Sequence, residues 1–373
     1  MINIIGVGDI MPGGILTGIN QGFATAEILD YLKTADIRVG TLETAIGDTP
    51  SFNPEKMSRD GDVIYAPDRD LAKLKEMNIN VVSLANNHFF DLGLDGAVHT
   101  IEMLDKLGIK HVGGGRNLEE ASQAAIETIN GETVAILGFC DYEEKYVGWC
   151  PYATPDQPGV NPMYKEHVEA EIKKYKAICD YVVVIPHWGR EHTYMTMLHV
   201  YNAAKAMIKA GADLILGGHP HRVQPVVNFR RSSVAYSMGN YLFPNRLLAP
   251  PRSTYYSDTE LDIYKLPTTD KYPIVEELTY KMWKPLALIG MMVNARLSKS
   301  GTRSTYQLTI MENGGRLAMH EDRSISRVLR YRGILIKYTS YSLYCYLIRC
   351  RNGVYRILTK LKNIISQLLR TSK

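Results

Sequence analysis

The sequence lacks several features that would place it in a secreted or membrane-spanning class. No apolar run reaches the roughly 20 residues that a spanning helix needs. The five cysteines are odd in number and include no C-x-x-C pair, which argues against a disulfide framework and favours a reducing compartment. Met1 leads directly into an apolar segment without the basic n-region of a signal peptide. We therefore expect a cytoplasmic protein that is not secreted.

Acidic residues are missing from the last part of the chain. Residues 323–373 contain twelve Lys or Arg and no Asp or Glu. Because the whole chain has 43 basic and 39 acidic residues, residues 1–322 keep a net charge of −8, against +12 for the rest. This split predicts an acidic body over 1–322 and a basic tail over 323–373 that has an anionic partner of its own.

The basic tail contains an amphipathic pattern. From Val354 to Leu369 apolar residues recur at i, i+3, i+4 and i+7, which predicts a helix with one apolar face. Such a helix, preceded by the uncharged and tyrosine-rich segment 338–348, is typical of a peripheral anchor on an anionic membrane surface, here the inner face of the membrane. A helix packed on the body or on a partner protein would have the same pattern. The acidic body argues against nucleic acid.

The body alternates short apolar runs with amphipathic segments, which is the pattern of an α/β protein. Strands are expected at 2–8, 37–42, 79–85, 132–139, 180–186, 213–217, 223–228 and 233–237. Helices are expected at 24–34, 67–77, 93–107, 117–125, 163–178 and 197–210. Segments 286–296 and 304–311 should form a hairpin, and a helix over 318–330 should close the body. Segments 50–65 and 245–285 are expected to be irregular.

Five of the expected strands end at residues that could bind a metal ion. These residues are Asp9, Glu43, Asn87 with His88, His187, and His219 with His221. Parallel strands bring their carboxyl ends to one edge of a sheet, which is the usual position of an active site. A single Asp after a strand is more often a cap or a turn residue, and a single His is as often a hydrogen-bonded structural group, but five such coincidences in one chain favour a common site.

The types of these side chains indicate a particular metal chemistry. His219 and His221 flank Pro220 in backbone that we expect to be extended, where side chains at i and i+2 point the same way. The set mixes carboxylate oxygen with imidazole nitrogen and has no thiolate, which suits Mn, Fe, Zn or Co. Seven candidate groups are too many for one tetrahedral ion, but they suit two ions that share a bridging carboxylate.

The order of these motifs resembles that of calcineurin-like metallophosphoesterases, and within them the CapA group of poly-γ-glutamate capsule biosynthesis proteins. The segments that carry the resemblance are 8–13, 41–43, 83–93, 113–121, 187–191, 217–225 and 237–240. Together they cover roughly residues 1–245. The resemblance implies a four-layer α-β-β-α sandwich, with two mixed β-sheets face to face and helices outside.

The resemblance also implies roles for the candidate residues. One or two divalent metal ions (Mn, Fe or Zn) would be bound, with Glu43 bridging them. The other expected ligands are Asn87, His187 and His219 for one ion, and Asp9 and His221 for the other. His88 would not be a ligand but would face the substrate and orient it or donate a proton to the leaving oxygen.

Several neighbouring residues modify this expectation. The superfamily usually has His where this chain has Met11, so the ion held by Asp9 loses an imidazole. Glu191 could fill that gap, bind substrate, or simply lie on the surface at a helix start. Asp91 would support His88 or cap the following helix.

Three further polar residues are considered for the site. Arg116 lies in a glycine-rich turn and could contact an anionic substrate, although the resemblance assigns it no role. For His192 and His199 no functional role is expected.

Two functions remain open at this point. The resemblance implies a hydrolase of a phosphoester or related bond in capsule or exopolymer biosynthesis, which uses metal-bound hydroxide. The alternative is a non-catalytic accessory subunit of a polymer synthesis or export complex that binds anionic polymer through the metal site, which Met11 favours. The expected partners are an anionic polymer or phosphoester substrate and, through the tail, an anionic membrane surface or a capsule-synthesis protein.

Overall fold

The computed structural model describes the chain except for residues 60–61, 142–148, 249–278, 313–314 and 351–373. The chain divides into two units, Met1–Asp322 and Arg323–Lys373. The amphipathic helix expected over 354–369 lies outside the described residues. Among the helices that the structure describes, none combines the length and apolar character needed to cross a membrane.

The unit Met1–Asp322 is built on two mixed β-sheets, and the first has eight strands. Their order is β21 (Arg316–His320), β20 (Arg303–Glu312), β19 (Ile289–Leu297), β1 (Ile2–Ile10), β2 (Ile37–Leu42), β6 (Val81–Ser83) and β7 (Lys110–Val112), and β16 (Asn240–Leu242) pairs with β1. β1, β2, β6 and β7 run parallel, whereas β19, β20 and β21 are antiparallel. The parallel part brings several carboxyl ends to one edge.

The second sheet has six strands. Their order is β14 (Val226–Asn228), β15 (Ser233–Ala235), β13 (Leu214–Leu216), β12 (Tyr181–His187), β10 (Glu132–Cys140) and β9 (Ala125–Ile129). β10, β12, β13 and β15 run parallel, and the two outer strands are antiparallel to their neighbours. The central strands β12 and β13 are buried along their whole length, which explains their continuous apolar runs.

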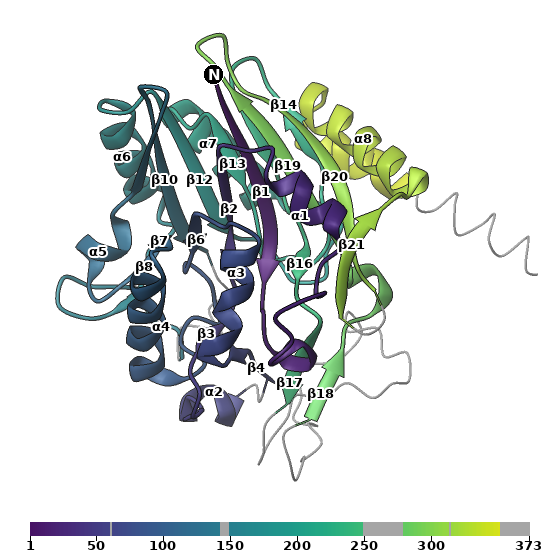
Figure 1. The fold of residues 1–373 in the computed structure, drawn as a ribbon. Coiled ribbons are helices and arrows are strands. Elements are labelled where there is room, and N and C mark those ends of the chain that lie inside the picture. Colours follow the sequence, from purple (N-terminus) through teal and green to yellow (C-terminus); the bar gives the residue numbers. More distant parts are fainter. Residues whose placement is uncertain (60–61, 142–148, 249–278, 313–314, 351–373) are drawn as a thin grey trace, which may run out of the picture. The chain divides into compact units, whose positions relative to one another are not determined.

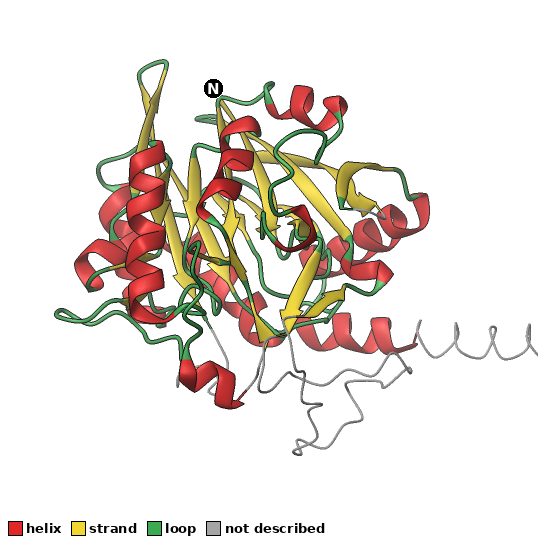
Figure 2. Ribbon diagram, turned by 60° about the horizontal axis from the view of Figure 1, so that its bottom comes forward, coloured by secondary structure: helices red, strands yellow, loops and turns green. Residues whose placement is uncertain are grey.

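Helices lie on the outer faces of both sheets (Figures 1 and 2). In this unit they are α1 (Ala26–Leu32), α2 (Pro54–Arg59), α3 (Ala72–Glu76), α4 (Gly93–Leu107), α5 (Leu118–Ser122), α6 (Lys165–Lys176) and α7 (Leu198–Ala210). α6 contacts α7, β10 and β12, whereas α1 contacts β21 and α4 contacts β7. The fold class that the sequence predicted, a four-layer sandwich with two mixed sheets, is therefore confirmed.

Smaller elements surround the ends of the sheets. Short strands are β3 (Ala45–Ile46) with β5 (Tyr65–Ala66), β8 (Gly114–Gly115) with β11 (Gly159–Val160), and β4 (Asp62–Val63) with β17 (Asn245–Leu248) and β18 (Thr279–Met282). Single 3-10 turns occupy Gly14–Leu16, Asp68–Leu71 and Pro285–Ala287.

Local chemistry fixes several helix ends near the positions that the sequence predicted. The Thr25 and Asn117 side chains accept hydrogen bonds from the first turns of α1 and α5. Gly108 ends α4 with a φ of 66°, a conformation that costs glycine little.

Three expectations about secondary structure were wrong in part. The helix expected over 318–330 begins at Arg323, as α8 (Arg323–Tyr338) of the second unit, because 316–320 pairs with β20 as strand β21. Segment 50–65 contains α2, which the Asn53 side chain caps by accepting from the Glu55 amide. The irregular segment expected over 245–285 begins and ends as the paired strands β17 and β18.

The two sheets approach each other closely at Gly6 of β1. A Cβ at this position would lie 2.6 Å from Leu216 Cδ1 of β13, so the absence of a side chain makes room for the leucine of the opposite sheet. We predict that Gly6→Ala lowers the free energy of unfolding by about 1–3 kcal/mol through overpacking, and that Leu216→Ala lowers it by about 2–5 kcal/mol.

The double variant tests the contact itself. In urea unfolding, the double variant Gly6→Ala with Leu216→Ala should lose less free energy of unfolding than the sum of the losses of the two single variants. The difference should be about 0.5–3 kcal/mol, because the new methyl group occupies part of the cavity. Gly6→Ala combined with Leu104→Ala, a buried residue of α4, serves as the additive control. Additivity in both pairs would contradict the contact between the sheets.

Candidate metal centre

The carboxyl ends of parallel strands from both sheets meet at one buried centre. Asp9 lies near the end of β1, and Glu43 directly follows β2. From the other sheet, His187 is the last residue of β12, and His219 follows β13. The backbone amide of His219 donates to Asp9 Oδ2 at 3.3 Å, which joins the edges of the two sheets.

Glu43, His187 and His219 form the first group of candidate metal ligands, with their ligand atoms within 4.8 Å of one another. His187 Nε2 lies 3.3 Å from Glu43 Oε1 and 3.1 Å from His219 Nδ1. It is also 2.9 Å from Asn87 Oδ1. All four side chains are buried, so four donor atoms converge in a site that excludes bulk water.

Asp9, Glu43 and His221 form the second group, and Glu43 belongs to both. His221 Nε2 lies 3.6 Å from Glu43 Oε1, and its Nδ1 lies 3.6 Å from Asp9 Oδ2. The same Nδ1 lies 2.7 Å from Asn240 Oδ1. Because Asn240 occupies Nδ1, Nε2 is the nitrogen left for an ion, as in many metal sites where a polar partner fixes the imidazole.

The polar atoms of the centre fit divalent cations. Within the described part of the chain, Asp9 Oδ1 and both carboxyl oxygens of Glu43 are buried without a hydrogen-bond partner. Leaving such oxygens unpaired costs free energy, and cations would satisfy them. A Cβ at Gly218 would lie 2.5 Å from Asp9 Oδ1, so this glycine preserves the space beside the carboxylate.

Burial shifts the titration of the candidate ligands. It raises the pKa of Asp9 to about 7. It raises the pKa of Glu43 well above its usual range, and the charges of Asp9 and Glu191 act in the same direction. It lowers the pKa of His187 and His221 well below the usual value. The imidazoles are thus neutral, which is the form that binds metal ions.

The backbone around Pro220 differs from the extended conformation expected from the sequence. His219 and His221 have φ values of 91° and 48°, in the left-handed region that non-glycine residues rarely adopt. The expectation was wrong because the chain turns here, and the two rings still face one centre, with centroids 6.3 Å apart. Backbone strain of this kind is concentrated at functional sites.

His88 borders the centre and is held by two charged residues. Its Nδ1 lies 2.7 Å from Asp91 Oδ2 and 2.9 Å from Lys56 Nζ. Lys56 Nζ is also 2.9 Å from Asp91 Oδ1, and the side chains of both are fully buried. The sequence analysis named Asp91 as a support of His88 but missed Lys56. The dipeptide Asn53-Pro54, a helix-start signal, could have revealed the helix that carries it.

Two residues of the loop after β12 lie near the centre. Glu191 is half-buried, and its charge raises the pKa of Glu43 and opposes the lowering of the pKa of His187 and His221 by burial. The ring of His192, for which no role was expected, lies 6.0 Å from that of His221. His199 is half-exposed and lies 3.5 Å from Asp141.

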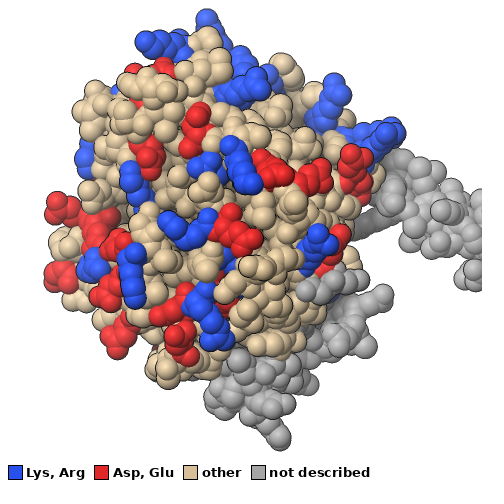
Figure 3. Space-filling model, in the orientation of Figure 1, with Lys and Arg blue, Asp and Glu red and all other residues tan. Residues whose placement is uncertain are grey.

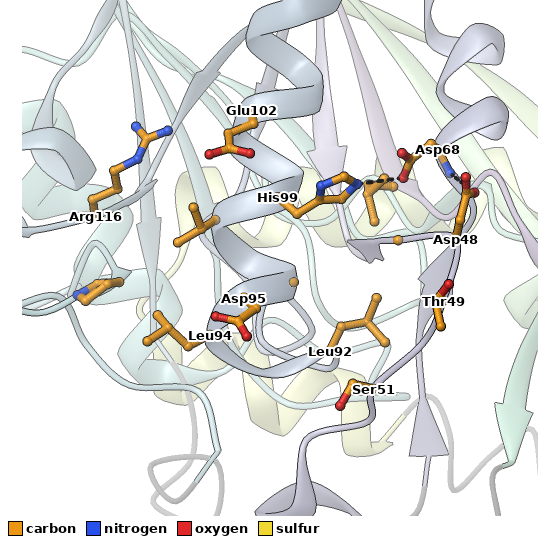
Figure 4. A pocket seen from close by; sticks show the side chains of 15 residues that line it. Asp48, Thr49, Ser51, Asp68, Leu92, Leu94, Asp95, His99, Glu102 and Arg116 are labelled. Carbon is orange, nitrogen blue, oxygen red and sulfur yellow. Dashed lines mark hydrogen bonds and ion pairs between the residues drawn. The ribbon is translucent and has the colours of Figure 1, made fainter.

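Arg116 is not part of this centre. Its Nη1 lies 2.7 Å from Glu120 Oε1, and the residue lines a separate pocket of 840 Å³ (Figure 4). Acidic residues of this pocket are Asp48, Asp68, Asp95 and Glu102. An arginine already paired with a carboxylate, beside an acidic lining, is poorly placed to bind the anionic substrate that the sequence suggested for it.

The family match and the similar proteins found for this chain agree with one another. Residues 3–245 match the family described as bacterial capsule synthesis protein PGA_cap. The capsule biosynthesis protein CapA of Bacillus anthracis is 32% identical over 245 residues, which cover 64% of this chain and 58% of that protein. The PGA biosynthesis protein CapA of Bacillus subtilis (strain 168) is 31% identical over 243 residues, covering 64% and 62%. The chain thus spans less than two thirds of either relative.

A solved structure was also found. The calcineurin-like phosphoesterase YfkN from Bacillus subtilis has 14% sequence identity and a TM-score of 0.43, covering 82% of this chain and 90% of that chain.

The shared carboxylate predicts how metal content responds to substitution. Protein loaded with Mn²⁺ and dialysed should retain two ions per chain by elemental analysis. His187→Ala and His221→Ala should each lose about one ion, whereas Glu43→Gln should lose both, because Glu43 belongs to both groups. His99→Ala, in the separate pocket, is the control. Retention of both ions by Glu43→Gln would contradict a bridging role.

The raised pKa of Asp9 predicts a pH-dependent destabilisation of the metal-free protein. Folded Asp9 keeps its proton up to a pKa of about 7, whereas in the unfolded chain it has an ordinary pKa of 3.8. The folded state binds more protons between these values, so the contribution of Asp9 to the free energy of unfolding falls as pH rises through this range. Asp9→Asn removes that loss. Its stability relative to the wild type should therefore increase from about pH 4 to pH 7 and then level off.

The relative stability is the quantity to measure because the buried histidines act in the opposite direction below about pH 6.5. Urea unfolding of both proteins after EDTA treatment, at several pH values, gives this difference. A difference that stays constant between pH 4 and pH 8 would show that the pKa of Asp9 is not raised.

Proposed function

The chain belongs to the bacterial capsule synthesis family PGA_cap, and we propose that it is a metal-dependent hydrolase that cleaves a phosphoester or related bond in capsule or exopolymer biosynthesis. The observation that carries this proposal is the pair of buried ligand groups that share Glu43. Asn87, His187 and His219 would hold one ion beside Glu43. Asp9 and His221 would hold the other.

A pair of bound divalent cations supplies Lewis acidity and lowers the pKa of a coordinated water. The protein contributes a buried site whose carboxylates and neutral imidazoles are already directed at one another. Asn240 fixes the ring of His221, and Asn87 contacts that of His187. This preorganisation reduces the rearrangement that catalysis would otherwise require.

His88 is the group that we assign to proton transfer. Asp91 and Lys56 both contact its Nδ1, so Nε2 is the nitrogen left to orient the substrate or protonate the leaving oxygen. The Lys56–Asp91 ion pair holds the ring in one orientation, because both partners are buried and neither can rotate into solvent.

A second candidate function is a non-catalytic accessory subunit that binds anionic polymer through the metal site. Met11 favours it, because this side chain is fully buried in an apolar cluster with Phe243 and Trp283 and offers no imidazole to the ion beside Asp9. In either function, we propose that the basic unit 323–373 contacts an anionic membrane surface or a capsule-synthesis protein. The amphipathic segment of that unit lies outside the described residues.

Turnover of model substrates tests the first function. With Mn²⁺ bound, we expect hydrolysis of p-nitrophenyl phosphate or of the corresponding diester. His187→Ala and His219→Ala should abolish it through loss of metal. His88→Gln should lower kcat by about 10²- to 10⁴-fold, the usual contribution of a general acid, and leave the metal content unchanged.

The controls separate the two functions. His99→Ala should retain both activity and metal. Activity that survives both His187→Ala and His219→Ala would refute the hydrolase assignment. A wild-type protein that binds two ions and retains an anionic polymer on a column, but turns over neither phosphate ester, would support the accessory function.

A further inference from the structure

Arg222 directly follows the candidate ligand His221 and is buried beside the metal centre. The residue is 6% exposed, and its Nη1 donates to the backbone carbonyl of His221 at 2.7 Å. Its Nε has no hydrogen-bond acceptor among the described residues. A guanidinium remains charged at all relevant pH values. A buried charge with an unsatisfied donor costs free energy, so the structure around Arg222 favours an anion that completes it.

A second arginine reaches the same region through Trp283. The indole ring of Trp283 lies 4.9 Å from the ring of His221. The Cζ of Arg246 lies 4.9 Å from the centroid of the Trp283 ring, a cation–π distance. Trp283 is 8% exposed, and its Nε1 is also buried without an acceptor in the described part of the chain. Two buried N–H donors, on Arg222 and Trp283, are thus left for a ligand.

His192 belongs to the same cluster, because its ring lies 6.0 Å from that of His221. Its ring lies 5.9 Å from that of Trp283. Burial lowers the pKa of His192 to about 3, and the charges of both Arg222 and Arg246 act in the same direction. Glu191 opposes this effect, and the same carboxylate also acts on Glu43 and His187. The rings of His192 and Trp283 thus lie beside that of His221, with Arg246 over Trp283 and Arg222 next to His221 in the chain.

We propose that Arg222 and Arg246, together with the indole N–H of Trp283, form a subsite for an oxyanion next to the metal centre. Guanidinium groups bind carboxylates and phosphates through paired, charge-assisted hydrogen bonds. On the face drawn in Figure 3 the described Lys and Arg are interspersed with Asp and Glu, so the outer surface there gives an anion no single-signed patch.

This subsite narrows the class of substrate that the protein could accept. That inference about the substrate rests on the proposed function. The metal ions would take the group at the reacting bond, and the arginine subsite would take a second oxyanion of the same molecule. A substrate that satisfies both positions carries repeated negative charges, as a chain of carboxylates or phosphates does. A substrate whose only anionic group lies at the reacting bond would supply no oxyanion to this subsite.

Binding of short oligoanions to the full chain loaded with Mn²⁺ tests the subsite without any need for turnover. The probes are tri-γ-glutamate and tripolyphosphate, and the neutral amide of the first is the chemical control; calorimetry gives Kd. Arg222→Gln should weaken binding of the preferred probe at least about tenfold, since hydrogen bonds to charged groups are worth about 1.5–3 kcal/mol. Arg222→Lys should recover part of the loss, because it keeps the charge without the planar fork.

Matched variants keep the result interpretable. Arg246→Gln should also weaken binding, and it carries the test if Arg222→Gln fails to fold. Arg231→Gln, which precedes the amino end of β15 and donates to the Lys299 carbonyl, should bind like the wild type. Metal content is measured in each variant, so that a loss of Mn²⁺ through His221 is not mistaken for a loss of the subsite.

The possible outcomes distinguish a carboxylate ligand from a phosphate ligand. They also distinguish failure of the subsite from failure of the proposed hydrolase function. If Arg222→Gln weakens binding of tri-γ-glutamate alone, the preferred ligand is a chain of carboxylates. If it weakens binding of tripolyphosphate alone, the preferred ligand is a chain of phosphates. Either result supports the subsite. The subsite would be refuted if the wild-type protein bound neither probe. It would also be refuted if Arg222→Gln and Arg246→Gln retained their metal and bound the probes as tightly as the wild type. Protein that binds an oligoanion through Arg222 but hydrolyses no ester would contradict the hydrolase and leave the subsite standing.

Discussion

The buried carboxylate of Glu43 is the group on which the centre depends. It belongs to both sets of candidate ligands, and neither of its oxygens has a hydrogen-bond partner among the described residues. A carboxylate at this depth is unfavourable unless positive charge neutralises it. In the metal-free protein, burial raises the pKa of Glu43 and of its neighbour Asp9. Protons can then neutralise the carboxylates in place of cations. A cation bound at Glu43 would therefore couple folding to metal binding.

The neighbourhood of Glu43 is built to hold imidazoles and cations at fixed positions. His219 and His221 accept left-handed backbone conformations, and Asn240 fixes the ring of His221. On the other side, Lys56 and Asp91 form a buried pair against His88. Removing either member of such a pair leaves an uncompensated buried charge, which is strongly destabilising. The strained backbone at His219 and His221 and the buried Lys56–Asp91 pair both fix the positions of imidazole rings.

Most of the site followed from the sequence because strand ends are local signals. Short apolar runs that stop at Asp9, Glu43 and His187 predict parallel strands, and parallel strands share one edge. The pairing of the two sheets and the grouping of ligands around Glu43 were expected from the family resemblance and not from the strand ends. The errors were also local. The expected helix over 318–330 overlaps the end of strand β21, and the backbone at Pro220 is not extended, because a strand partner and a strained turn leave little trace in the sequence.

The sequence by itself determined the α/β class, the ligand types and their order along the chain, because these depend on periodicity and on the residues at strand ends, and its motifs resembled a family with a four-layer sandwich. Only the tertiary structure decided which other side chains surround the centre. Lys56 comes from a segment without a strong pattern, and Trp283 lies beyond the segments that carry the family resemblance. Arg116, which looked suitable in its glycine-rich turn, faces an acidic pocket instead. Contacts between residues far apart in the chain depend on how the layers pack, and no local pattern records that packing.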